Sequence, residues 1–179
     1  VPIPPSFVRR PVADAKAIAA AVDAIEGAHS PLIVIGSGAN RTMASRMLEQ
    51  LVDKSGIPFL TTQLGKGVID ERHPQFIGCA ALSSGDFVHA AIRKADVIVN
   101  IGHDVIEKPP FFMTTGGATV IHVSNRSAEV DPIYFPQIEI VGDIANAVWQ
   151  ITETLTAREH WDCASMLAAR VAEIEHREA

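Results

Sequence analysis

The chain has 179 residues, 47% of them hydrophobic, and a formal net charge of -6, which is enough apolar content for one well-buried domain. The acidic balance and the lack of a long basic block argue against nucleic-acid binding, because neutralising phosphates requires clustered Lys and Arg. No apolar run approaches the ~18 residues of a membrane span, so we expect no membrane partner.

The first part of the chain alternates helical and strand patterns. Residues 1–11 contain four prolines and indicate an extended linker. Apolar residues at helical spacing then follow as far as Gly27, namely Val12, Ala15, Ile18, Ala19, Val22 and Ile25. Next we expect a strand at 32–35, a tight loop, a helix that ends at Gly56, and a second strand at 59–61.

The same alternation continues to the end of the chain. A short strand is expected at 76–78, and Ser84 or Asp86 suits the cap of the helix after it. Further strands are expected at 96–101, 118–123 and 137–141, with a long loop at 102–117. Asp143 suits the N-cap of the next helix. A final helix from about Glu159 is expected to carry one apolar side, with Trp161, Leu167, Val171 and Ile174.

The expected strands are apolar throughout instead of alternating with polar residues. This pattern is typical of a parallel sheet that is covered on both faces. We therefore predict a three-layer, Rossmann-like α/β domain with about six parallel strands. Ligands in such sheets bind beyond the carboxyl ends of the strands, where the strand order reverses.

A glycine loop follows the first expected strand and opens a helix. Its sequence is Gly36-Ser37-Gly38-Ala39-Asn40-Arg41, and this context can bring backbone N–H groups to a phosphate. Arg41 stands where the third glycine of a dinucleotide motif belongs, and Thr61-Thr62 ends the second strand without an acid, so NAD is poorly supported. Tight packing of strand against helix explains the glycines equally well, and the sequence leaves both interpretations open.

Catalytic and metal-binding patterns are missing from the sequence. The seven histidines form no HxH or HExxH motif, and no GxSxG appears. His103-Asp104 suggests an acid–base pair, but adjacent residues at a strand end usually diverge. Cys79 and Cys163 are far apart and fit reduced thiols in the cytoplasm. We therefore assign no catalytic residue and no metal ligand.

Two aromatic residues stand together in the long loop, at Phe111-Phe112. An exposed pair of this kind indicates a ligand lid or a surface for a partner. Alternatively, both rings fold back as a small cluster of their own. We favour contact with a neighbouring domain that this chain does not contain.

Several stretches together resemble the central domain of thiamine-diphosphate-dependent enzymes, the acetolactate synthase and 2-oxo-acid decarboxylase group. The most specific stretch runs from Ile57 to Pro74, includes Gly65-Lys66-Gly67, and is followed by Gly78. The other stretches are 30–38, 95–102, 120–123 and 140–143, in the family's order and spacing. The resemblance covers about residues 13–155.

The resemblance implies a six-stranded, deoxyhypusine-synthase-like sheet that lies between two other domains. Those flanking domains bind the pyrimidine and the pyrophosphate of thiamine diphosphate, and they carry the activating Glu and the Mg²⁺ ligands. We accordingly expect a linker at 1–11, the central domain at 12–156, and a C-terminal helix or linker at 157–179. The complete enzyme would be a cytoplasmic homo-oligomer that acts on a 2-oxo acid, and the chain by itself is expected to be inactive.

In flavin-containing relatives this domain holds FAD without redox use, and other relatives hold ADP or nothing. The resemblance carries candidate nucleotide-binding roles to Gly36, Ser37, Gly38, Thr62, Leu64, Gly65, Lys66, Gly102, His103 and Asp143. Asp104 replaces the Arg of flavin-binding relatives, and Ser124 replaces their Asp, so the pocket is altered or empty. Rival interpretations are a stand-alone flavin or NAD module and a purely structural or oligomerisation domain.

Overall fold

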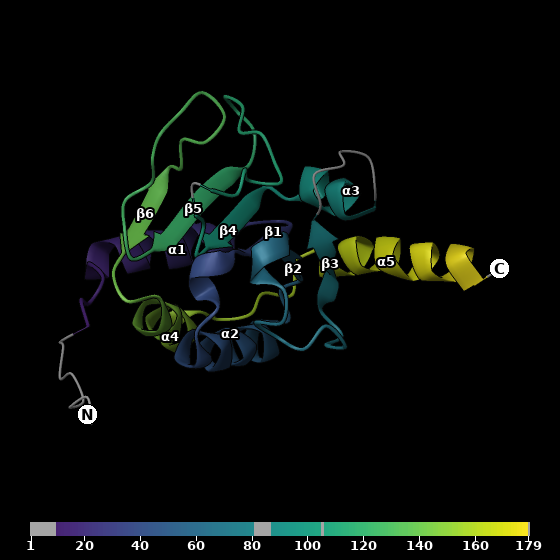
Figure 1. Ribbon diagram of the computed structural model, residues 1–179, viewed down its shortest axis with the longest axis horizontal. Coiled ribbons are helices and arrows are strands. Elements are labelled where there is room, and N and C mark those ends of the chain that lie inside the picture. Colours follow the sequence, from purple (N-terminus) through teal and green to yellow (C-terminus); the bar gives the residue numbers. More distant parts are fainter. Residues whose placement is uncertain (1–9, 81–86, 105, 179) are drawn as a thin grey trace, which may run out of the picture.

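The computed structural model describes residues 10–80, 87–104 and 106–178, and helices and strands alternate along them (Figure 1). The strands are β1 (Pro31–Ile35), β2 (Phe59–Thr62), β3 (Phe76–Ala80), β4 (Val97–Ile101), β5 (Thr119–Ser124) and β6 (Ile138–Val141). The helices are α1 (Ala15–Gly27), α2 (Thr42–Ser55), α3 (Phe87–Lys94), α4 (Ile144–Thr154) and α5 (Cys163–Glu178), with short 3₁₀ turns η1 (Ser37–Ala39) and η2 (Gln63–Gly65).

The six strands form one sheet in the order β3-β2-β1-β4-β5-β6. Every neighbouring pair is parallel, which confirms the predicted three-layer α/β fold. The strand order reverses between β1 and β4, because the chain builds outward from β1 in one direction and from β4 in the other. The loops after these two strands therefore flank the place where such sheets bind ligands.

Alternate residues of each strand face opposite sides of the sheet, and both sides are buried. In β1, Ile33 and Ile35 pack on the side covered by α1, α2 and α4. Leu32 and Val34 pack on the side covered by α3 and α5. Continuous burial on both faces explains why the strands carry no polar alternation.

The side of the sheet that carries α3 and α5 is only partly covered by helices. No helix occurs in the described part of the β4–β5 connection, nor in residues 125–137 between β5 and β6. Side chains from these two loops take the place of helices, and Phe111, Met113 and Tyr134 are buried in that layer. Parallel crossovers usually contain a helix, so this face is covered less regularly than the other.

The ends of the predicted helices differ in part from expectation. Asp14 accepts the Ala17 N–H at 3.2 Å and fixes the start of α1, so Val12 lies outside it and is 69% exposed. The last helix begins at Cys163 and not near Glu159, because Trp161 packs against the core on the α1, α2 and α4 side of the sheet instead of joining the helix. Val171 is 53% exposed and is not part of a buried face.

Other caps follow the sequence prediction closely. Gly56 ends α2 in the left-handed conformation, with φ 68°, where glycine carries no steric cost. Asp143 accepts the Asn146 N–H at 2.9 Å and caps α4. The predicted caps at Ser84 and Asp86, and most of the 1–11 linker, lie outside the described residues.

Candidate functional site

The loops that follow β1 and β4 touch each other through glycines. The Gly36 N–H donates to the Ile101 carbonyl at 2.8 Å, and the Gly38 N–H donates to the Gly102 carbonyl at 2.9 Å. A Cβ at Gly36 would lie 2.6 Å from the Gly102 oxygen. Gly102 has φ +72°, and a Cβ there would lie 2.3 Å from the Ala39 nitrogen. Close packing therefore accounts for these glycines without a ligand.

The loop after β2 joins the same edge of the sheet. Gly65 lies against the end of β1, because a Cβ there would be 2.1 Å from the Ile35 carbonyl oxygen. Its N–H donates to the Thr62 hydroxyl at 3.2 Å and shapes η2. The structure thus brings the loops after β1, β2 and β4 together, as the topology predicted.

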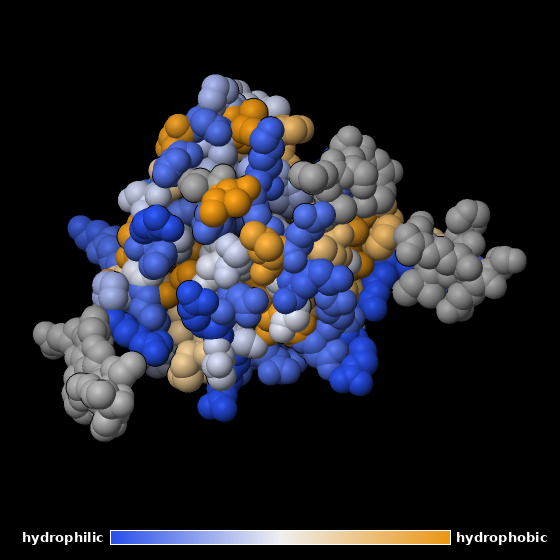
Figure 2. Space-filling view, in the orientation of Figure 1, coloured by the Kyte–Doolittle hydropathy of each residue, from blue (hydrophilic) through white to orange (hydrophobic). Residues whose placement is uncertain are grey.

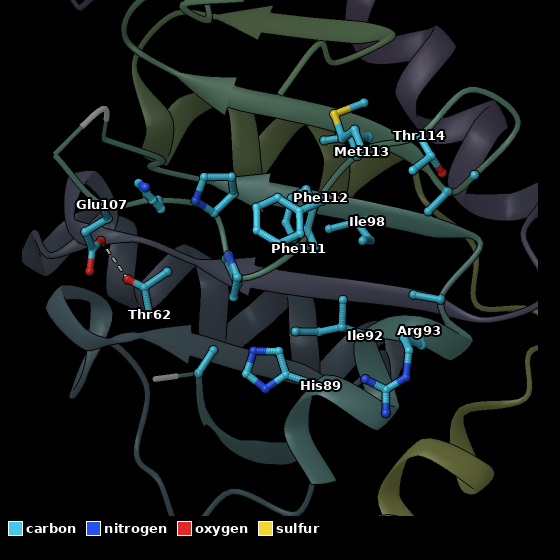
Figure 3. Close-up of a pocket in the computed structure, with 18 of the residues that line it drawn as sticks. Thr62, His89, Ile92, Arg93, Ile98, Glu107, Phe111, Phe112, Met113 and Thr114 are labelled. Carbon is cyan, nitrogen blue, oxygen red and sulfur yellow. Dashed lines mark hydrogen bonds between the residues drawn. The ribbon is translucent and has the colours of Figure 1, made fainter. Parts of the chain in front are cut away.

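The carboxylate of Glu107 bridges two of these loops. It accepts the Thr62 hydroxyl at 2.7 Å (Figure 3). It also accepts the Leu64 N–H at 2.8 Å. The resemblance gave Thr62 and Leu64 nucleotide-binding roles, but here the Glu107 carboxylate occupies both of these hydrogen-bond donors. Sequence reasoning missed Glu107, since an acid five positions after Gly102 carries no motif that would single it out.

Two other candidates lie away from this bridge. Lys66 extends toward Glu71, with 4.0 Å between Nζ and Oε1, and its side chain is 57% exposed. Asp143 follows β6, two strands from β4, where it caps α4 and meets Arg10 at 3.5 Å. The structure therefore does not place Asp143 beside the glycine loops.

A buried polar network lies at the ends of β4 and β5. The Tyr134 hydroxyl accepts from Asn100 Nδ2 at 3.0 Å and donates to His122 Nδ1 at 2.8 Å. His122 Nε2 donates to the Arg126 carbonyl at 3.0 Å, and a carbonyl can only accept, so this tautomer of neutral His122 satisfies the network. These bonds hold the 125–137 loop against the sheet.

Burial lowers the pKa values of the two histidines in and beside this network. Desolvation lowers the pKa of His122 and, together with the nearby His122 ring, lowers the pKa of His103. The His103 ring lies 4.6 Å from the Tyr134 ring. Asp104 accepts the Ile106 N–H at 3.1 Å, and no ion pair joins it to His103 among the described residues. The acid–base pair suggested by His103-Asp104 is not formed here.

A cavity of about 870 Å³ lies on the α3 side of the sheet, under the β4–β5 loop (Figure 3). It shares Thr62, Gln63 and Leu64 with the edge described above, but its floor is apolar. Its volume falls in the range of small-molecule sites. Phe111 lines it and is buried, whereas Phe112 is 70% exposed. The two adjacent rings therefore differ in environment.

The described residues contain no group of three His, Cys, Asp or Glu side chains suited to a metal ion. Neither cysteine forms a disulfide, and burial raises the pKa of the Cys163 thiol to about 11, so it stays protonated at neutral pH. None of the helices in the described segments is long and apolar enough to cross a membrane.

The strand order and the loops at the switch point define a Rossmann-like α/β domain. Residues 18–151 match the family model "Thiamine pyrophosphate enzyme, central domain", and the chain belongs to this family.

Known relatives support that assignment. The chain is 31% identical to acetolactate synthase of Bacillus subtilis over 140 residues, covering 77% of this chain and 24% of the relative. It is 30% identical to the acetolactate synthase large subunit of Pyropia yezoensis over 155 residues, covering 82% and 25%. It is 28% identical to 2-hydroxyacyl-CoA lyase 1 of Mus musculus, covering 85% and 25%. The chain thus spans about a quarter of the length of these relatives.

Proposed function

We propose that this chain is the central, non-catalytic domain of a thiamine-diphosphate-dependent 2-oxo-acid lyase or carboligase of the acetolactate synthase type. The observation that carries the proposal is the family match over residues 18–151, together with relatives of which the matched segment is only about a quarter. In this proposal the complete enzyme is a cytoplasmic homo-oligomer, and domains flanking residues 12–156 bind thiamine diphosphate and Mg²⁺.

The site chemistry supports a non-catalytic role. The glycines at the switch point pack loop against loop, and Glu107 ties the β2 and β4 loops together. These contacts suit a rigid domain that spaces its neighbours.

A turnover assay tests the non-catalytic role. The chain is incubated with pyruvate, thiamine diphosphate and Mg²⁺, and acetolactate synthase of Bacillus subtilis serves as the positive control. We expect no carbon dioxide release above a buffer blank from this chain. Release above the blank would refute the proposal. The coding sequence next to this chain supplies a second check, since we expect a Gly-Asp-Gly motif followed by Asn downstream.

We further propose that FAD or ADP binds this chain weakly, along the loops after β1, β2 and β4. The residues present fit an anionic nucleotide poorly, because Glu107 takes the Thr62 and Leu64 donors and Gly38 already donates to Gly102. Asp104 adds a further negative charge beside them. This observation also favours a purely structural domain as the second candidate function.

Calorimetry with FAD and ADP on the wild type and on Asp104→Arg distinguishes these candidates. Arg at this position removes a repulsion and adds a cation, so we expect tighter nucleotide binding by the variant. Because the change also removes the bond to the Ile106 N–H, thermal melting of both proteins controls for folding. Tight FAD binding by the wild type that the substitution leaves unchanged would contradict the proposed weak site. Absence of binding by both proteins would favour the structural domain.

A further inference from the structure

The cavity under the β4–β5 loop has an apolar interior built from three directions. Ile98 of β4 and Val120 of β5 form its floor, and both are buried. Ile92 of α3 forms one wall, and Phe111 and Met113 of the loop lie opposite (Figure 3). The cavity exists because this crossover packs a loop, and not a helix, over β4 and β5.

Among the described residues that line this cavity, two side chains are cationic and one is a carboxylate. Arg93 reaches the rim from α3, and Lys108 reaches it from the loop; both are exposed. Among the described residues, no acidic side chain forms an ion pair with either of them. Glu107 also lines the cavity, but its two oxygens are held by Thr62 and Leu64. His89 lines the cavity beside Arg93 on α3.

Apolar surface continues outward from the cavity. Ile106 and Phe112 are 82% and 70% exposed and lie on the same loop. In Figure 2 apolar side chains gather over the loops at the top of the view, among polar neighbours. The lining of the cavity thus includes apolar side chains that remain accessible to solvent.

We propose that this cavity binds a small amphipathic monoanion, with an aromatic or branched apolar body and one carboxylate. The body lies between Ile92 and Phe111, and the carboxylate meets Arg93 at the rim. A guanidinium matches a planar carboxylate in two parallel hydrogen bonds. With two cations and one carboxylate at the rim, the local charge favours a single negative charge over a polyphosphate.

This inference goes beyond the proposed function and does not rest on it. The cavity shares Thr62, Gln63 and Leu64 with the proposed nucleotide loops, but the rest of its lining lies on the α3 face of the sheet, away from Gly36–Gly38. The ligand also differs in chemistry, since it carries one charge and an apolar body.

The test is an NMR titration of the 179-residue chain with 4-phenylbutanoate and with its neutral amide, 4-phenylbutanamide. We expect amide signals of α3 and of residues 106–118 to shift with both ligands. The acid should bind about fivefold more tightly than the amide, as rim-exposed ion pairs allow. Absence of shifts at millimolar ligand, or shifts confined to other segments, would overturn the assignment.

Two variants locate the ligand and its charge preference. Arg93→Ala should bring the affinity for the acid close to that for the amide. Arg46→Ala is the matched control, because Arg46 is an exposed arginine on α2, on the opposite face of the sheet, and it should change nothing. If Arg93→Ala leaves the preference for the acid intact, the cationic rim does not select the ligand.

Variants that fill the cavity provide a second test of the proposed binding site. Ala118 lines the cavity and is half-buried, so Ala118→Phe should place a ring inside and abolish binding of both ligands. Signal dispersion and the melting temperature verify folding, and Ala118→Leu replaces this variant if the phenyl ring lowers stability. Undiminished binding by a folded cavity-filling variant would show that the ligand lies elsewhere.

Discussion

At the residue scale, Glu107 binds Thr62 and Leu64, two residues that the family resemblance assigned to nucleotide binding. Its carboxylate receives donors from Thr62 and Leu64 and thereby connects loops that are 45 positions apart in sequence. Charge-assisted hydrogen bonds of this kind are stronger than neutral ones. A side chain of the protein itself therefore occupies two hydrogen-bond donors near the switch point.

Replacing Glu107 with Gln tests the strength of this bridge. The amide keeps the shape but loses the charge and one of the two acceptor oxygens, so we expect a loss of about 1 kcal/mol in the free energy of unfolding. Urea unfolding followed by circular dichroism measures it. Glu71→Gln is the control, since Glu71 lies 4.0 Å from Lys66 at the surface and should cost little. Equal effects of the two variants would contradict a bridging role for Glu107.

The network around His122 predicts a pH dependence of stability. Burial lowers the pKa of His122 below the ordinary value of 6.5, so below that value the unfolded chain takes up a proton that the folded chain refuses. The stabilisation is complete above pH 6.5 and is lost as the pH falls toward the lowered pKa. His103 adds to the effect in the same direction.

Urea unfolding at pH values on both sides of 6.5 measures this dependence. In His122→Gln the slope of stability against pH should decrease, leaving the share of His103. His160→Gln is the control, because His160 is exposed, and it should preserve the wild-type slope. A slope that His122→Gln leaves unchanged would mean that His122 is not held neutral by the fold.

At the scale of elements, the packing of one loop against another determines how much stability is lost when a glycine is replaced. Gly102 and Gly116 both have positive φ, +72° and +77°. A Cβ at Gly116 would have no other atom within 4 Å, whereas a Cβ at Gly102 would lie 2.3 Å from the Ala39 nitrogen. The two positions therefore separate the cost of backbone conformation from the cost of a clash.

Gly116→Ala should cost about 1 kcal/mol, the usual penalty for a left-handed residue with a side chain. Gly102→Ala should cost several kcal/mol more, because the β1 and β4 loops must move apart to admit the methyl group. Thermal and urea unfolding of both variants measure the difference. Similar losses in the two variants would show that the loops do not pack as closely as the structure indicates.

The elements could be predicted from sequence because their signals are local. Apolar runs such as 32–35 indicated buried strands, and Asp143 and Gly56 indicated helix ends by their own chemistry. Trp161 was misplaced because its partners lie in the other core cluster, which no local pattern reveals. The glycine loops were recognised, but only the spatial contact of Gly36 with Gly102 shows that packing accounts for them.

The polar network was missed for a related reason. Asn100 and His122 each interrupt an otherwise apolar strand, which is a visible signal that one side of the sheet holds polar groups. Their partner Tyr134 lies in the 125–137 loop, and nothing in the sequence sets that pairing. Contacts that depend on long loops are specified by tertiary packing and not by spacing along the chain.

At the scale of the whole molecule, the two faces of the sheet are covered differently, one by helices and the other partly by loops. Helices α1, α2 and α4 cover one face, and the larger of the two core clusters lies between them and the sheet. On the other face, two loops replace helices and leave both a cavity and exposed apolar side chains. Contact with a neighbouring domain, predicted from Phe111-Phe112, remains a prediction, and Phe112 is the member of the pair that is free to make it.

The two phenylalanines provide a test of that division. Phe111 is 8% exposed and packs in the core on the α3 and α5 side of the sheet, so Phe111→Ala should cost about 3 kcal/mol or more in the free energy of unfolding. Phe112 is 70% exposed, so Phe112→Ala should leave stability within about 0.5 kcal/mol. Sedimentation of concentrated protein is the second measurement, because removing an exposed ring should reduce self-association if it covers a partner surface. A large loss of stability in Phe112→Ala would show that this ring packs in the core. Neither phenylalanine would then be available for contact with a neighbouring domain.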